Sequence, residues 1–201
     1  MYRMKYIFTP MNQKHANIVS DWHYDGVYSF YDMAADEDDL RILMDTENWR
    51  DIIKAVLNEN DELVGWAAFY AENDEFWLSL GLRPDLTGRG LGEEFVSECV
   101  NYAISQYKLI TDTIKLHVAL FNQRAIKVYQ RAGFIETNKT IRDTHIGQVD
   151  FIEMEKHIAP STALSPTAAT NKHESSLTTP LREIQSTLQP REMKRIVLEK
   201  Q

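Results

Sequence analysis

Glycines just before a predicted helix form the first candidate site in this chain of 201 residues. The segment LGLRPDLTGRGLG, residues 80–92, places Gly88, Gly90 and Gly92 after a strand and a proline. Glycine lets the backbone come close to a ligand. The first turn of the following helix offers N–H groups that have no intrahelical acceptor, together with the positive end of the helix dipole. This combination predicts an anion-binding loop, most naturally for phosphate.

Two common phosphate-binding motifs do not match the spacing of these glycines. The dinucleotide motif G-x-G-x-x-G requires a glycine where Glu93 or Phe95 stands. The Walker motif G-x-x-x-x-G-K-[ST] requires a Gly-Lys pair, and the sequence contains none. A glycine-rich turn between a strand and a helix can also be a tight turn without a ligand, so the loop alone leaves both interpretations open.

A second patterned segment, LHVALFNQRAIKVYQRAGF, occupies residues 116–134. It predicts a strand followed by a helix, because Asn122 is a typical N-cap and Gly133 is typical of the residue that ends a helix. His117 lies in the strand, and Tyr129 lies on the apolar face of the helix. Each of these two side chains has a plain structural interpretation, as a strand histidine and as a core tyrosine, beside a chemical one.

The rest of residues 1–156 supplies the strands and helices that position these segments. Alternating apolar residues predict strands, and apolar residues at helical spacing predict helices. The predicted strands are 2–9, 52–57, 63–71, 76–82, 114–121, 134–142 and 148–154. The predicted helices follow Asn12, end the aromatic and acidic segment 22–40, begin at Leu91, and follow Asn122. The order β-α-α-β-β-β-α-β-α-β-β predicts an α/β (α+β) fold, with a mixed central sheet of about seven strands and about four helices.

The composition indicates a soluble globular protein with an acidic surface. Hydrophobic residues make up 43% and charged residues 26%, and the net charge is −8. Nucleic acid and anionic lipid are unfavourable partners, because both bind basic surfaces. The single cysteine, Cys99, excludes an internal disulfide and a cysteine-rich zinc site. No apolar run has the length of a signal peptide or a membrane span, so we expect a cytoplasmic protein with no metal and no nucleic-acid or membrane partner.

Residues 157–201 differ from the rest of the chain. They contain no glycine and no aromatic residue, but four of the six prolines. The stretch 159–179, rich in serine, threonine and alanine, cannot bury enough apolar surface to offset its ordering entropy. We therefore expect a folded domain over residues 1–156 and a low-complexity tail over 157–201, with two short helices at about 180–189 and 191–200. These helices either lie on the surface or dock on the domain or on a partner subunit.

Taken together, the two patterned segments resemble the Gcn5-related N-acetyltransferase (GNAT) superfamily, in its bacterial members. In that family a Q/R-x-x-G-x-G/A loop binds the pyrophosphate of coenzyme A, and a later L-x-V-x-x-x-N-x-x-A-[IL]-x-[VL]-Y-x-x-x-G-F segment completes the site. The second pattern is matched throughout, by Leu116, Val118, Asn122, Ala125, Ile126, Val128, Tyr129, Gly133 and Phe134. The resemblance covers about residues 1–156. It implies transfer of an acetyl group from acetyl-CoA to a primary amine, by direct attack in a ternary complex.

The resemblance also implies which residues hold acetyl-CoA. Backbone groups of Leu80 and Leu82 pair with its pantetheine arm where two parallel strands separate, and Asn122 forms a hydrogen bond to the same arm. The pyrophosphate is held by the loop residues Thr87, Gly88, Arg89, Gly90, Leu91 and Gly92.

Thr87 is a departure from the family pattern, which has glutamine or arginine at the head of the loop. Threonine offers a hydroxyl but no charge. Most of the cradle is backbone and survives the change. Arg83 and Arg89 are candidates for the missing cation, and each is alternatively an ordinary solvated surface arginine.

An acid and a base are the catalytic residues that the resemblance implies. Tyr129 occupies the position of the family's general acid, seven residues after Asn122, and a phenol with a reference pKa of about 10 can donate a proton to a thiolate. His117 stands where bacterial ribosomal-protein alanine N-acetyltransferases have a glutamate, and an imidazole accepts a proton near neutrality. Glu72 and Glu75 are alternative bases, and a chain of water molecules is a further alternative.

The segment after the first strand is the expected acceptor site, because this family usually builds that side of the site there. Its aromatic and acidic residues suit a cationic amine, through cation–π contact and Coulomb attraction. The candidate acceptor-binding residues are Trp22, Tyr24, Asp25, Tyr28, Tyr31 and Asp32. The expected acceptor is a cationic small molecule or an amine of a protein or peptide. A plainer interpretation of the segment is an aromatic core beside a solvated acidic helix.

A second class of function stays open at this stage. A non-catalytic module that binds acyl-CoA or a partner protein would keep the glycine loop and use the tail for interaction. Tyr129 favours the enzyme, whereas Thr87 and the tail leave room for the module. The acceptor, the length of the acyl group and the formation of a homodimer are left open by the sequence.

Overall fold

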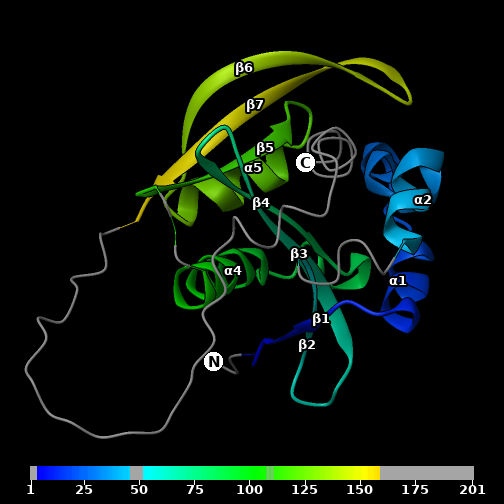
Figure 1. The fold of residues 1–201 in the computed structure, drawn as a ribbon. Helices are drawn as coiled ribbons and strands as arrows, with labels where there is room; N and C mark the ends of the chain where they lie inside the picture. The colour runs from blue at the N-terminus through cyan, green and yellow to red at the C-terminus, as the bar shows by residue number, and fades with distance from the viewer. Residues whose placement is uncertain (1–3, 46–51, 108, 110, 159–201) are drawn as a thin grey trace, which may run out of the picture.

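The computed structural model describes residues 4–45, 52–107, 109 and 111–158. These residues form one seven-stranded sheet in the order β1-β2-β3-β4-β5-β7-β6 (Figure 1). The strands are β1 (Ile7–Pro10), β2 (Ile53–Leu57), β3 (Leu63–Glu72), β4 (Glu75–Leu82), β5 (Thr113–Ala119), β6 (Ile135–Thr144) and β7 (Gly147–His157). Neighbouring strands are antiparallel except β4 and β5, which run parallel. The mixed sheet confirms the fold class that the sequence predicts.

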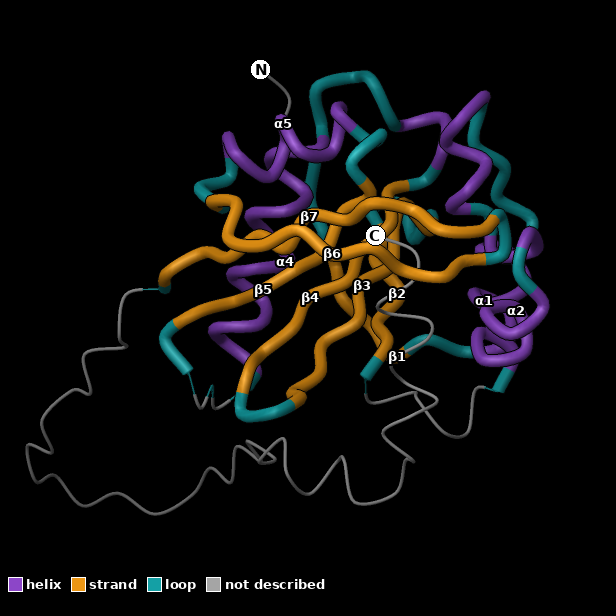
Figure 2. Tube along the Cα trace, turned by 90° about the horizontal axis from the view of Figure 1, so that it is seen from above, coloured by secondary structure: helices purple, strands orange, loops and turns teal. Residues whose placement is uncertain are grey.

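Helices cover both faces of this sheet. The α-helices in the described residues are α1 (Gln13–Ser20), α2 (Glu37–Met44), α4 (Gly92–Gln106) and α5 (Gln123–Arg131). The same residues contain three short 3-10 helices, η1 (Gly26–Tyr31), η2 (Met33–Ala35) and η3 (Pro84–Leu86). Figures 1 and 2 show α1 and α2 on one side of the molecule and α4 and α5 on the other. The order of helices and strands along the chain is the predicted one.

Local signals set the ends of two helices. The side chains of Asn12 and Asn122 each accept the N–H three residues further on, at 2.9 Å and 3.1 Å, and so begin α1 and α5. After α5, Gly133 has a φ of +91°, in the region that favours glycine. By contrast, β1 is shorter than the predicted strand 2–9, because its pairing with β2 extends only over Ile7–Pro10.

Two apolar cores lie on the two faces of the sheet. The larger core packs the sheet against α4 and α5, and it contains the buried rings of Phe69, Phe76 and Phe95. The second core packs the sheet against α1 and α2, and it contains Trp66 and Trp77. Because successive residues of a strand point to opposite faces, the central strands carry apolar side chains on both sides. This two-sided burial holds the central strands in place.

The parallel strands β4 and β5 pair at one position and then separate. Trp77 lies opposite Lys115, and the described strands share no pair beyond it toward their carboxyl ends. Both strands stay paired on their outer sides, β4 with β3 up to Leu82 and β5 with β7 up to Ala119. The sheet therefore opens between the carboxyl ends of two parallel strands, where ligands commonly bind in open α/β sheets.

The register of β4 decides which of its backbone groups face this gap. The N–H of Arg83 donates to the carbonyl of Val64, in β3, at 2.8 Å. In an antiparallel pair, positions bonded in this way alternate with positions that are not. Leu80 and Leu82 occupy the positions that are not bonded to β3. Their N–H and C=O groups therefore face into the gap.

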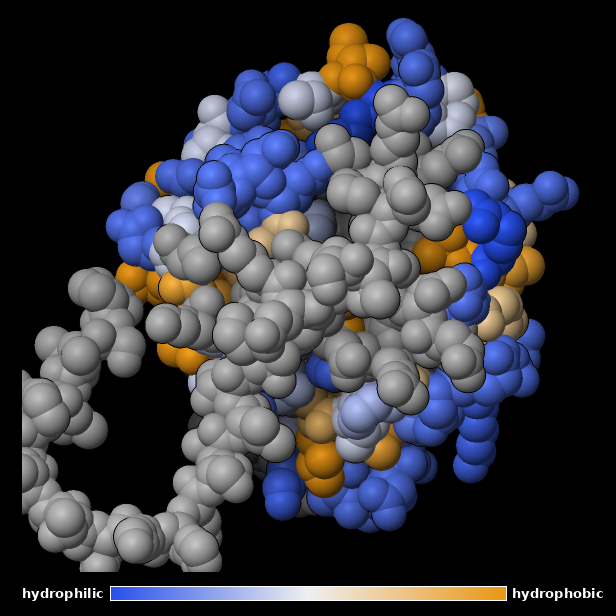
Figure 3. Space-filling view, viewed as in Figure 1, coloured by the Kyte–Doolittle hydropathy of each residue, from blue (hydrophilic) through white to orange (hydrophobic). Residues whose placement is uncertain are grey.

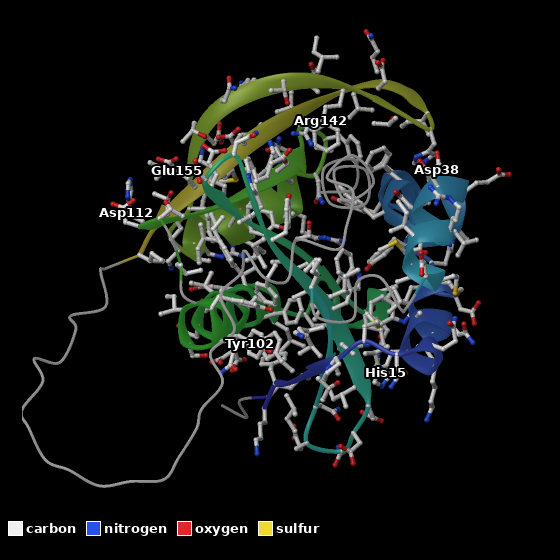
Figure 4. The ribbon with its side chains drawn as sticks, viewed as in Figure 1. His15, Asp38, Tyr102, Asp112, Arg142 and Glu155 are labelled. Atoms are coloured by element: carbon white, nitrogen blue, oxygen red, sulfur yellow. The ribbon has the colours of Figure 1, made fainter. Side chains whose placement is uncertain are left out.

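The hairpin of β6 and β7 extends past the sheet and reaches α2 (Figures 1 and 4). At its tip, Nδ1 of His145 lies 3.8 Å from Oδ2 of Asp36, the N-cap residue of α2. The His145 ring also stacks on Phe30, with ring centroids 5.2 Å apart. Figure 4 shows Asp38, in the first turn of α2, close to this tip. The hairpin thus contacts the segment between α1 and α2.

The surface in Figure 3 is mainly hydrophilic where described residues form it, with small separate hydrophobic patches. Within the described part of the chain, no helix has the length and apolar character needed to cross a membrane. β7 ends at His157, beside the predicted end of the domain, and the predicted tail helices at 180–189 and 191–200 lie outside the described residues. The division into a domain over 1–156 and a tail over 157–201 therefore stays a prediction.

Replacing Gly81 of β4 with alanine is expected to destabilise the fold. A Cβ atom at this position would lie 2.3 Å from Nε1 of the buried Trp66 side chain. Because overpacking of a core typically costs about 1–3 kcal/mol, we expect Gly81→Ala to lower the free energy of unfolding in urea by that amount. The same substitution in a Trp66→Leu background should cost clearly less. An equal cost in both backgrounds would show that the indole is not the obstacle.

Candidate active site

A cavity of about 390 Å³ opens where β4 and β5 separate. Its walls come from the end of β4, the glycine loop, the first two turns of α4, helix α5, and the segment between α1 and α2. The predicted site residues that line it are Tyr24, Tyr28, Tyr31, Leu80, Leu82, Thr87, Gly88, Gly90, Gly92, Asn122 and Tyr129. The predicted residues that do not line it are Trp22, Asp25, Asp32, Arg89, Leu91 and His117.

The glycine loop bends back on itself at the entrance to α4. Gly88 and Gly90 have φ angles of +74° and +82°, which a residue with a side chain adopts only with strain. A Cβ atom at either position would meet nothing within 4 Å, so the conformation rather than space requires glycine. Among the described residues, the N–H groups from Gly88 to Gly92 donate to no backbone carbonyl. The loop therefore offers a set of unused donors beside a helix N-terminus.

Gly92 allows α4 to lie against α5. A Cβ atom on Gly92 would lie 3.1 Å from Cγ2 of Val128, closer than a methyl group normally comes to a carbon atom. The two helices that border the cavity thus approach each other at this glycine.

The open edge of β4 has one donor already facing it. The hydroxyl of Tyr24 donates a hydrogen bond to the carbonyl of Leu82, at 2.9 Å. Burial raises the pKa of Tyr24, so its hydroxyl keeps the proton that it donates. Tyr24 therefore bridges the segment after α1 and the strand whose backbone groups face the gap.

Thr87 and Arg83 are engaged within the loop itself. The Thr87 hydroxyl donates to the carbonyl of Pro84 at 2.7 Å. The Arg83 guanidinium binds Asp85 through two hydrogen bonds, and it also donates to the Leu63 carbonyl. Arg83 in turn lowers the pKa of the Asp85 carboxyl. Arg83 is thus paired with the neighbouring carboxylate of Asp85 and does not line the cavity.

Tyr129 lies on α5 and contributes its ring to the core and to the cavity wall. Its side chain is buried, and its ring packs edge-on against Phe134, with centroids 6.0 Å apart. Burial raises the pKa of Tyr129, and the neighbouring Tyr31, Cys99 and Tyr24 raise it further. The phenol is therefore neutral and protonated near neutral pH.

His117 lies on the opposite face of the sheet from the helices that border the cavity. Its neighbours Leu116 and Val118 belong to the core under α4 and α5, so the alternation of β5 directs His117 to the other side. Its ring stacks on Trp77, with centroids 4.4 Å apart and planes 8° from parallel. Burial lowers the pKa of His117 to about 3, helped by Arg142 and Lys115. The side chain is thus a neutral member of a packed layer.

The alternative bases also lie away from the cavity. Glu72 and Glu75 flank the turn between β3 and β4, at the other end of β4 from the glycine loop. Glu75 forms an ion pair with Lys115, which also lies 3.0 Å from Glu153. Neither Glu72 nor Glu75 lines the cavity.

The predicted acceptor residues divide into two groups. The tyrosines Tyr24, Tyr28 and Tyr31 line the cavity. Trp22 instead packs in the core under α1 and α2. The buried Asp32 accepts the N–H of Tyr24 at 2.8 Å and pairs with His23, and Asp25 is exposed at the start of η1. Asp32 therefore shapes the loop from outside the cavity, while the rings of the three tyrosines line it.

Two arginines that the sequence interpretation did not single out also line the cavity. Arg124 and Arg131 stand near the two ends of α5. Their spacing in the sequence could have revealed them, because residues seven apart lie on the same face of a helix. Val128 lies on that face as well, and it contacts Gly92 at the cavity. Among the described residues, the cations that line the cavity therefore come from α5.

Solved structures with the same fold include several acetyltransferases. A spermidine N-acetyltransferase chimera from Vibrio cholerae and hSSAT is 17% identical over 76% of this chain and 95% of its own, with a TM-score of 0.61. The spermidine N-acetyltransferase from Vibrio cholerae in complex with CoA and spermine is 16% identical over 76% and 95%, with a TM-score of 0.59. An acetyltransferase (GNAT family) from Bacillus anthracis is 13% identical over 77% and 96%, with a TM-score of 0.57. At these identities the likeness shows the fold.

No curated protein sequence matches the chain. The model of the acetyltransferase (GNAT) family matches residues 17–134, which hold the glycine loop, Asn122 and Tyr129. This match spans more than half of the 201 residues and includes both segments that carry the resemblance. The chain therefore belongs to the acetyltransferase (GNAT) family.

Proposed function

We propose that the protein transfers the acetyl group of acetyl-CoA to a primary amine, by direct attack within a ternary complex. Membership of the family makes it an acetyl-CoA-dependent N-acetyltransferase rather than a purely non-catalytic module. The cavity at the separation of β4 and β5 is the observation that carries the proposal, because it joins the glycine loop to Tyr129. One cavity thus reaches both an anion-binding loop and a proton donor.

The residues around the cavity fit acetyl-CoA, which would supply the acetyl thioester. The unused N–H groups from Gly88 to Gly92 suit a pyrophosphate at a helix N-terminus. The backbone groups of Leu80 and Leu82 form an open strand edge, which suits the amides of a pantetheine arm. Arg131 adds a cation near the loop. Asn122 lines the same cavity, although its side-chain oxygen already caps α5.

Tyr129 is proposed as the general acid. When the amine forms its bond to the acetyl carbon and the carbon–sulfur bond breaks, a proton must reach the departing sulfur. The Tyr129 phenol lines the cavity and is protonated near neutral pH, so it is available to donate that proton. The proton that the amine loses goes to water, which then restores the phenol.

His117 takes a structural role in this proposal. Its ring is stacked on Trp77 on the other face of the sheet, and its side chain does not line the cavity. Its pKa of about 3 also makes it a weak base. A water molecule in the cavity is therefore the proposed acceptor of the amine proton.

The acceptor is proposed to enter beside the tyrosines between α1 and α2. The solved spermidine N-acetyltransferases, one of them with spermine bound, support the cationic amine that the sequence predicts. However, Asp25 and Asp32, on which that prediction rests, do not line the cavity. The geometry supports a primary amine in general, and a small molecule or a protein or peptide amine both meet that description. The homodimer and the cytoplasmic location also remain predictions.

Replacing Tyr129 with phenylalanine removes the proposed acid and keeps the ring. We expect kcat to fall by about 10²–10⁴-fold, because a positioned general acid typically contributes that much. The Kd for acetyl-CoA should stay the same, since the packing against Phe134 is retained. Release of thiol from acetyl-CoA with a panel of primary amines measures kcat, and calorimetry measures the Kd.

The control for this variant is Tyr102→Phe. Tyr102 lies on α4 outside the cavity (Figure 4), so removal of its hydroxyl should change kcat less than about threefold. Equal losses in the two variants would show a general effect of removing a hydroxyl. Unchanged turnover in Tyr129→Phe would contradict the acid role. Binding of acetyl-CoA without turnover of any amine would contradict the proposed function.

Replacing His117 with glutamine should make the free energy of unfolding depend less on pH below about pH 6.5. The folded pKa of about 3 lies below the ordinary value of 6.5, so the unfolded chain takes up a proton between these values and the folded chain does not. Stability therefore falls as the pH drops below about 6.5, by up to about 1.4 kcal/mol per pH unit from this group. Urea unfolding between about pH 7 and pH 5 should show a shallower fall in His117→Gln.

The exposed histidine His157 provides the matched control, and His157→Gln should keep the slope of the unaltered protein. The dependence of kcat/KM on pH should also be the same with and without His117. Loss of the limb of that profile near neutral pH in His117→Gln would show that His117 is the base after all.

A further inference from the structure

The charged side chains on the described part of the cavity wall are two arginines that stand apart along α5. Nε of Arg131 lies 3.4 Å from Oε2 of Glu93, in the first turn of α4, so Arg131 belongs to the end near the glycine loop. Arg124 is in the first turn of α5, seven residues away. At 1.5 Å per residue this separation is about 10 Å. The two cations therefore stand at different ends of one cavity.

Arg124 is held at the tyrosine end of the cavity. Its guanidinium carbon lies 4.1 Å from the ring centroid of Tyr28, as expected for a guanidinium stacked on an aromatic face. Its charge also acts on Tyr24 and Tyr31, which places it among the three tyrosines of the cavity. Stacking fixes the guanidinium plane and leaves its N–H edge available. That edge is a planar fork that matches the two oxygens of a carboxylate.

Arg124 has no counter-ion among the residues that the structure describes. Within the described residues, no carboxylate forms an ion pair with it, whereas Arg131 has Glu93 and Arg83 has Asp85. The nearby Asp32 binds the backbone of Tyr24 and the ring of His23 instead. Arg124 is exposed and lines the cavity, so a bound molecule can reach its guanidinium, and a carboxylate is the anion whose shape that group matches.

We infer that Arg124 binds a carboxylate of the acceptor, so that the acceptor is a primary amine of the α-amino-acid class. This inference rests on the proposed function. The phosphates of acetyl-CoA are expected at the opposite end, where the loop N–H groups and Arg131 stand. The rings of Tyr28 and Tyr31 give the acceptor end an aromatic wall for the side chain of such a molecule. Arg124 is thus a specificity-determining residue.

The experiment compares molecules that differ in one charge. The probes are the standard L-amino acids, each beside its carboxamide, which keeps the amine and removes the negative charge, with spermidine as a polycation. We expect the acid to be favoured over its carboxamide in kcat/KM by about tenfold or more, the usual effect of a charge-assisted pair. In Arg124→Gln that ratio should fall to about one.

Arg131→Gln is the matched control, on the same helix and in the same cavity. It should raise the KM for acetyl-CoA and leave the ratio of acid to carboxamide as it was. The opposite result, in which Arg124→Gln raises the KM for acetyl-CoA and keeps the ratio, would overturn the inference, because Arg124 would then bind a phosphate of acetyl-CoA. Acetylation of spermidine in preference to every amino acid would also overturn it.

A binding measurement separates this inference from the proposed function. Calorimetric titration of the same amino acids and carboxamides into the protein saturated with CoA needs no turnover. Tighter binding of the acids, lost in Arg124→Gln, supports the carboxylate site even if no amine is acetylated. Equal binding of acids and carboxamides overturns the site even if the protein acetylates other amines.

Discussion

The separation of β4 from β5 is the constraint on which the rest of the structure depends. Beyond the pair formed by Trp77 and Lys115, the backbone groups of β4 that point toward β5 have no strand to pair with among the described residues. Buried backbone groups without partners are costly, so other donors and acceptors must occupy the gap. Tyr24 supplies one of them at Leu82. A ligand with amide groups can supply the others, which explains why an opened sheet becomes a binding site.

Side chains below the gap fix the point at which pairing stops. Lys115 forms ion pairs with Glu75 of β4 and Glu153 of β7, so that three strands are joined at one level. On the same face His117 stacks on Trp77, and both are buried. A charged and aromatic layer of this kind holds the strands together on one side of the gap while their carboxyl ends diverge on the other. The imidazole of His117 is thus part of the packing that holds β5 beside β4.

The fold and the glycine-loop side of the cavity could be predicted because their signals are local. Glycine spacing, the Asn122 cap and Gly133 each act within a few residues of their own position. The acceptor side could not be predicted in the same way. The carboxylate of Asp32 is held outside the cavity by hydrogen bonds to the N–H of Tyr24 and to the ring of His23. The amino-acid composition of the segment does not reveal such contacts. Strand alternation between Leu116 and Val118 did contain the information that His117 lies on the other face of the sheet from α4 and α5.

Charge explains why the positions of the arginines matter more than their number. Residues 157–201 contain six basic and four acidic residues, so residues 1–156 contain 16 and 26 and carry a net charge of −10. A field of that sign repels an anionic substrate, but salt screens it beyond about 8 Å, so contacts inside the cavity decide binding. At the loop end, the carboxylate of Glu93 partly neutralises Arg131. We therefore expect the backbone N–H groups of the glycine loop to provide most of the attraction for an anion there. At the tyrosine end, the exposed Arg124 is stacked on Tyr28 and has no carboxylate partner among the described residues, so its N–H groups stay available to a bound acceptor.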